Sequence, residues 1–118
     1  MTSAPDASGW RCRADALPPG RAVALDVGTG AGLVPGFIVN HDGRHYAYVN
    51  RCPHAGAPLD RRPGSFFAED GRHLVCGAHG AVFAPETGVC VEGPCPGARL
   101  EALRVERDGP DVVVTRRT

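Results

Sequence analysis

Two short stretches, each holding one cysteine and one histidine, constrain this chain more than any other feature. Residues 52–59 read CPHAGAPL and residues 76–81 read CGAHGA. Together they offer two sulfur and two nitrogen ligands, a complete set for a small metal centre. Sulfur suits iron–sulfur clusters and zinc, and imidazole suits iron and zinc. The four candidate ligands are Cys52, His54, Cys76 and His79.

The glycines of these stretches allow a cysteine and a histidine that are close in sequence to bind the same metal centre. A cysteine and a histidine two or three positions apart reach one centre only where the backbone between them turns sharply. Gly56, Gly77 and Gly80 permit such turns because they lack a Cβ. They also let backbone N–H groups approach a negatively charged centre, as runs of amides do at iron–sulfur sites.

Cys-x-His followed later by Cys-x-x-His, each pair followed by glycine, resembles the signature of the Rieske [2Fe–2S] family. In that family two histidines replace two cysteines on one of the two irons. The resemblance implies that Cys52 and Cys76 hold the inner iron, while His54 and His79 hold the outer iron and face solvent.

A third segment strengthens the resemblance, which extends over roughly Trp10 to Val114. Gly93-Pro94-Cys95-Pro96, followed by Leu100, is similar to the proline-rich loop that covers a Rieske cluster. One departure is the 21 residues between His54 and Cys76, a little more than the usual gap. We interpret the excess as a longer loop around Arg61 to Gly71, which costs little free energy. The residues that we expect around the cluster are Gly56, Ala57, Gly77, Ala78, Gly80, Ala81, Phe83, Pro94, Cys95 and Pro96.

Composition favours one domain built from turns and short strands. The 118 residues include 16 glycines and 11 prolines, well above average usage. Together with the resemblance, this predicts an all-β fold, a Rieske-like antiparallel β-sandwich with a small cluster-binding subdomain over about residues 50–97. We expect a disordered tail at residues 1–9 and the domain itself at 10–118.

Alternating apolar residues and turn signals predict the strands and the loops between them. Asp42-Gly43 and Asp70-Gly71 mark turns, so that both ligand loops follow directly on strands. We see no helix. The expected strands are 22–27, 36–39, 45–49, 74–75, 82–83, 89–91, 100–105 and 112–114, with 17–20 a turn and 28–32 a loop.

Charge and hydropathy exclude several classes of partner. The formal net charge is zero at pH 7, so no overall field attracts nucleic acid or an anionic membrane. We find no signal peptide and no stretch long enough to span a bilayer. The expected protein is soluble and cytoplasmic.

Other readings of these side chains remain open at this stage. Tetrahedral zinc accepts the same two cysteines and two histidines, although zinc sites more often use Cys-Cys and His-His pairs. His73 lies three positions before Cys76, but we expect it to face solvent, as we do His41 and His45. We expect the remaining cysteines, Cys12, Cys90 and Cys95, to be small buried residues. The alternatives are a disulfide between Cys90 and Cys95, which the cytoplasm disfavours, and a position of Cys95 close to the cluster.

Departures from the high-potential members of the family predict a low reduction potential. Those proteins usually carry a disulfide where this chain has Ala57 and Ala78, and hydroxyl groups where it has Ala81 and Phe83. Hydrogen bonds to the cluster raise its potential by stabilising the reduced state. We therefore expect a potential near the low end of the Rieske range, about −150 mV.

The resemblance implies a one-electron carrier and not an enzyme in itself. The expected protein is a ferredoxin that passes electrons from a flavin reductase to a terminal oxygenase or a similar acceptor. The alternatives are an electron-transfer subunit of a larger oxidoreductase, like the small subunit of nitrite reductase, or a zinc-stabilised interaction module. The chain is too short to hold the mononuclear iron domain of an oxygenase as well.

Overall fold

The computed structural model describes residues 9–29, 32–53, 56–60, 64–77, 80–94 and 96–116. Over these residues the protein is all-β, with one short 3-10 turn, η2, at Ala14–Ala16. The strands are β1 (Trp10–Arg13), β2 (Ala22–Thr29), β3 (Gly32–His41), β4 (Arg44–Val49), β5 (Leu74–Val75), β6 (Val82–Phe83), β7 (Cys90–Glu92), β8 (Ala102–Asp108) and β9 (Asp111–Thr115).

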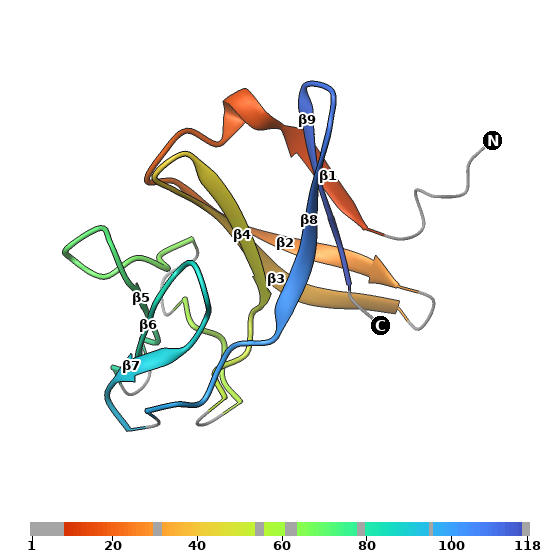
Figure 1. Cartoon of the computed structure of the whole chain (residues 1–118). Coiled ribbons are helices and arrows are strands. Elements are labelled where there is room, and N and C mark those ends of the chain that lie inside the picture. Colours follow the sequence, from red (N-terminus) through yellow and green to blue (C-terminus); the bar gives the residue numbers. More distant parts are fainter. Residues whose placement is uncertain are drawn as a thin grey trace.

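Six strands form one strongly bent antiparallel sheet in the order β1-β9-β8-β4-β3-β2. The sheet curls into a barrel-like shape (Figure 1), and a bridge between Gly9 and Gly28 brings its two edge strands together. The interior is filled by aliphatic side chains from β2, β3, β4, β8 and β9. Its fully buried members include Val27, Ile38, Val112 and Val114.

The β3–β4 hairpin is the framework on which both halves of the molecule are built. Asp42 and Gly43 have φ angles of 54° and 86°, the left-handed pair that a two-residue hairpin turn requires. β3 is buried on both faces: Ile38 points into the barrel, whereas Phe37 and Val39 belong to a second core on the other side. Burial on both faces explains why the sequence of this strand is a continuous apolar run and does not alternate with polar residues.

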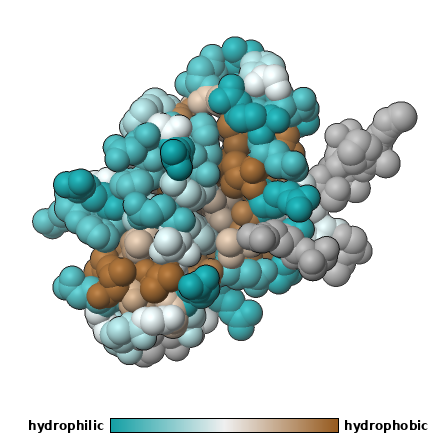
Figure 2. Space-filling view, in the orientation of Figure 1, coloured by the Kyte–Doolittle hydropathy of each residue, from teal (hydrophilic) through white to brown (hydrophobic). Residues whose placement is uncertain are grey.

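The second core lies between the hairpin and a small sheet inserted between β4 and β8, in the order β5-β6-β7 (Figure 1). Phe66 stacks on Phe37, with ring centroids 4.3 Å apart. Tyr48 of β4 donates its hydroxyl proton to the Pro85 carbonyl, and burial raises the pKa of that hydroxyl. These contacts hold the small sheet against the barrel. Apolar residues also gather on the surface over the small sheet (Figure 2), where Val91 of β7 is exposed.

The structure confirms most of the expected strands and the turns between them. The prediction of a loop over residues 28–32 is wrong at Gly28, Thr29 and Gly32, because β2 and β3 continue pairing up to the register Thr29–Gly32. Strand β1 was not predicted; it is formed by pairing with β9 at the far end of the chain. Only the tertiary structure provides that partner.

Two histidines that were expected to face solvent are largely buried instead. The Nε2 atom of His45 is buried, and burial lowers the pKa of the ring. The side chain of His41 is only 17% exposed, and its Nε2 lies 3.5 Å from the carboxylate of Glu86, in the connection between β6 and β7. Both residues belong to the packing between β3, β4 and the neighbouring segments.

In the part of the chain that the structure describes, no helix has the length and apolarity that crossing a bilayer requires.

Candidate metal centre

The two cysteines of the expected ligand set begin two loops that are built in the same way. Cys52 follows β4 and Cys76 follows β5, and their exposed fractions are 1% and 0%. Cys52 N–H donates to the Ala57 carbonyl at 2.7 Å, and Cys76 N–H donates to the Ala81 carbonyl at 2.8 Å. Each cysteine thus bonds to the residue five positions further on, which closes a tight loop.

The second feature that the two loops share is a glycine four positions after each cysteine. Gly56 N–H donates to the Cys52 carbonyl at 2.7 Å, and Gly80 N–H donates to the Cys76 carbonyl at 2.9 Å. Both glycines have a φ of +74°, a conformation that side chains with a Cβ rarely adopt. The two loops therefore share one backbone design, although the cysteine–histidine spacing in the sequence differs between them.

A short hydrogen-bonded chain joins the two loops to each other. Asn50 accepts the Leu59 N–H at 2.8 Å and donates to the Asp60 carboxylate at 2.9 Å. The Leu59 carbonyl in turn accepts the N–H of Gly77, directly after Cys76, at 2.9 Å. Asn50 was not among the residues predicted from the sequence, because an asparagine at the end of a strand is common and carries no distinctive pattern.

Removing the Asn50 side chain tests this link. In Asn50→Ala the N–H of Leu59 loses its acceptor, which costs roughly 1–3 kcal/mol when the donor stays out of contact with water. We expect faster release of the metal centre on mild heating, measured as loss of visible absorbance. Asp60→Asn leaves the bond from Leu59 N–H to the Asn50 oxygen in place, and it is expected to release the centre more slowly than Asn50→Ala. Equal release from both variants and the unsubstituted protein would contradict this role.

The proline-rich segment packs directly on the second loop. Gly93 has a φ of +102°, and a Cβ added there would lie 2.8 Å from the Ala81 Cα and 3.1 Å from the Gly80 carbonyl oxygen. The segment is anchored on β7, where Gly97 N–H donates to the Cys90 carbonyl at 3.0 Å. A segment in backbone contact with a ligand loop fits the covering role that the sequence predicts for residues 93–96.

The remaining predicted site residues divide into those that the structure describes and those that it does not. Ala81 and Phe83 are fully buried, Ala57 is partly exposed, and Pro94 and Pro96 are exposed. Four predicted residues lie outside the described residues, and they are His54, Ala78, His79 and Cys95.

The other candidate ligands have different roles where the structure describes them. The Nδ1 of His73 lies 2.7 Å from the Asp70 carboxylate. Asp70 also accepts backbone N–H groups from Arg72 and His73, and these bonds lower the pKa of its carboxyl to about 2. Among the described residues, no group of three His, Cys, Asp or Glu side chains is arranged to bind a metal ion.

The two further described cysteines fit the expectation of small packed residues. Cys90 is buried in the second core, and its thiol donates to the Glu92 carbonyl at 3.2 Å. Cys12 on β1 is partly buried, and burial raises the pKa of its thiol.

The described residues fit an iron–sulfur centre. Two buried cysteines start matching loops that a hydrogen bond ties together, and the glycines leave room for close approach of the backbone. The second core places the sulfurs among apolar groups, which keeps water away from a cluster and affects its potential.

Comparison with known families agrees with this geometry. The Rieske [2Fe–2S] domain family matches residues 9–116, and the chain belongs to this family. Its cofactor is therefore a Rieske-type [2Fe–2S] cluster, a one-electron carrier. Among curated protein sequences, none matches the chain.

Solved structures show the same fold. The ferredoxin of carbazole 1,9a-dioxygenase from Nocardioides aromaticivorans IC177 is 29% identical, with a TM-score of 0.73 over 93% of this chain and 99% of that one. The ferredoxin in a complex of reduced oxygenase and oxidised ferredoxin of carbazole 1,9a-dioxygenase is 24% identical, with a TM-score of 0.71 over 92% and 94%. The terminal oxygenase from Novosphingobium sp. KA1 is 15% identical, with a TM-score of 0.75 over 93% of this chain and 30% of that one.

Proposed function

We propose that this protein is a low-potential Rieske ferredoxin whose cluster is held by the two matching loops. The supporting observation is the shared design of the loops that begin at Cys52 and Cys76. Cys52 and Cys76 would hold one iron through their thiolates, and His54 and His79 would hold the other through their imidazoles. Bound there, the cluster supplies a site for one electron, and imidazoles in place of thiolates raise its potential above that of an all-cysteine cluster.

The chain's own residues give the cluster a rigid and mostly dry surrounding. Loop closure by Gly56 and Gly80 orients the cysteines, and Gly93 lies against the backbone of Gly80 and Ala81 at the end of the second loop. Fully buried Phe83 has no hydroxyl group to donate. Hydrogen-bonded loops of this kind limit movement of the ligands when the charge of the cluster changes, which suits an electron carrier.

The proposed partners are a flavin reductase as donor and a terminal oxygenase as acceptor. The similar ferredoxin from Nocardioides aromaticivorans belongs to a carbazole dioxygenase, and a ferredoxin of such a system has been solved with its oxygenase. We propose that the chain carries electrons without catalysing a reaction on a substrate and that it acts in the cytoplasm. The proposed domain runs from residue 10 to residue 118, with the cluster-binding part at about residues 50–97.

Metal and sulfide analysis with a visible spectrum tests this function. We expect two irons and two acid-labile sulfides per chain and a red-brown protein that bleaches when dithionite adds one electron. A colourless protein with one zinc per chain would support the zinc-stabilised module instead and would contradict the proposal.

The reduction potential provides a separate prediction. Ala81 and Phe83 offer no side-chain donor to the cluster, so we expect a midpoint of about −150 mV. The double substitution Ala81→Ser with Phe83→Tyr should raise the midpoint, because hydroxyl groups that donate to the cluster stabilise its reduced state. Protein-film voltammetry measures both values. A midpoint above zero in the unsubstituted protein would refute the assignment of low potential.

A further inference from the structure

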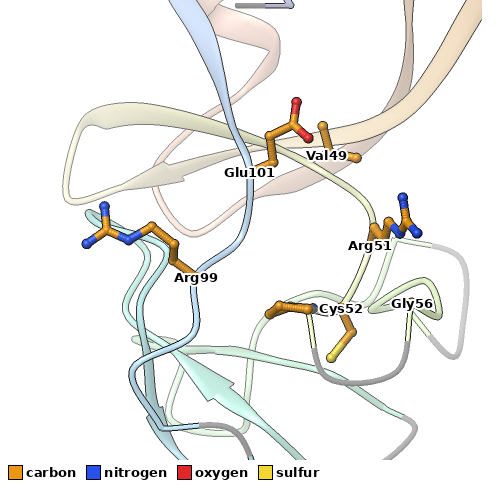
Figure 3. A pocket seen from close by; sticks show the side chains of 7 residues that line it. Val49, Arg51, Cys52, Gly56, Arg99 and Glu101 are labelled. Carbon is orange, nitrogen blue, oxygen red and sulfur yellow. The ribbon is translucent and has the colours of Figure 1, made fainter.

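A groove lined by arginines lies beside the first ligand loop. One cavity of about 290 Å³ is bordered by Arg51, Cys52 and Arg99 (Figure 3). A second, of about 340 Å³, extends to Arg116. Both cavities are lined by Val49, Arg51, Gly56 and Glu101, so together they form one groove, here called the arginine groove.

The groove carries an excess of positive charge on a chain whose net charge is zero. Arg116 binds the Glu101 carboxylate, with Nε–Oε2 at 3.1 Å and Nη2–Oε1 at 3.4 Å, so these two charges offset each other. Among the described residues, Arg51 and Arg99 have no acidic partner, and both are exposed. Two guanidinium groups are therefore available to an external anion.

The shape of the groove favours an extended ligand over a single small anion. Arg51 and Arg99 lie at opposite ends of the first cavity, with Cys52 between them, and their guanidinium groups point away from each other (Figure 3). A ligand that pairs with both groups therefore has to extend across the cavity. The lining also includes apolar Val49 and Pro53, which suit the backbone and side-chain stems of a peptide segment.

The groove is also electrostatically linked to the redox site. Arg51 immediately precedes Cys52, and its Nε lies 3.9 Å from where a Cβ on Gly56 would stand. When a donor gives up one electron, the centre gains one negative charge beside the groove. An anionic ligand there is then repelled more strongly, and it therefore binds the oxidised protein more tightly than the reduced one.

We propose that the arginine groove docks the electron donor through an extended acidic segment of that protein. This inference rests on the proposed function. A donor must bind the oxidised carrier and leave the reduced one, and repulsion after electron transfer favours that order. An acidic acceptor would be disfavoured, because it must bind the reduced form.

The test uses the cluster-loaded protein and an acetylated, amidated hexaglutamate peptide as the probe. Calorimetric titrations at low salt are expected to show binding of hexaglutamate and no binding of hexaglutamine. The dissociation constant should rise about two- to fivefold when dithionite reduces the protein. Salt should weaken binding because it screens exposed charges.

Two double variants distinguish binding in the arginine groove from a general effect of the protein's net charge. Arg51→Gln with Arg99→Gln should weaken hexaglutamate binding by about five- to twentyfold, the combined effect of two exposed ion pairs. Arg21→Gln with Arg44→Gln makes the same charge change at exposed positions near the opposite end of the barrel, and it should leave binding within about twofold.

Equal weakening by the two double variants, or no binding at all, would overturn the proposal. Tighter binding to the reduced protein would overturn the assignment of the groove to the donor. Binding that depends on Arg51 and Arg99 in a protein that proves to hold zinc would instead refute the electron-transfer function while leaving an acidic-segment site in place.

Discussion

Cys52→Ala and Cys76→Ala are each expected to remove the cluster almost completely. Each variant removes one of the two buried thiolates that would bind iron, and no other described side chain is placed to replace it. The visible absorbance and the iron content should fall to near zero in both. Because the cysteines lie in the second core, loss of the cluster should also lower the melting temperature of the protein.

Cys12→Ala is the matched control for these variants. Cys12 lies on β1 in the barrel, away from both ligand loops, and its substitution should keep the full iron content. Iron and sulfide that persist at two per chain in Cys52→Ala or Cys76→Ala would contradict the ligand assignment.

The second large effect is expected at Gly93, where space and backbone conformation both exclude a side chain. In Gly93→Ala the new Cβ would lie 2.8 Å from the Ala81 Cα, so one of the two backbone segments has to move. The positive φ of +102° adds a strain of about 1–2 kcal/mol. Together we expect a destabilisation of about 2–4 kcal/mol and a cluster that oxygen or chelators remove much faster.

Gly97 supplies a close control, because it lies in the same segment with a φ of +88° but has no atom within 4 Å of a built Cβ. Gly97→Ala therefore carries only the conformational cost, about 1–2 kcal/mol. Chemical denaturation and the rate of bleaching in a chelator measure both variants. If Gly97→Ala is as damaging as Gly93→Ala, contact with the second ligand loop is not what makes Gly93 important.

Features encoded by nearby residues could be predicted from the sequence. The Asp42-Gly43 turn needs only its own two residues and the apolar runs on either side, and the structure shows the left-handed angles that such a turn requires. The loops at Cys52 and Cys76 were likewise recognisable, since cysteine, histidine, glycine and proline are dense there. Their expected positions at the ends of β4 and β5 are confirmed.

Features that depend on distant parts of the chain could not be predicted. Strand β1 exists because it pairs with β9, about a hundred residues away in the sequence. The role of Asn50 depends on where Leu59 and Gly77 come together in space. The arginine groove joins Arg51 to Arg99 across the boundary between the barrel and the small sheet, and neither residue belongs to a recognisable motif.

Pulsed EPR of the dithionite-reduced protein, labelled with ¹⁵N-histidine, reports directly on the proposed ligand set. We expect an electron spin coupled to two histidine nitrogens, with both couplings kept in His73→Gln and one lost in each of His54→Gln and His79→Gln if any cluster is retained. A paramagnetic cluster without histidine nitrogen coupling, or a protein that holds only zinc and gives no signal, would contradict it.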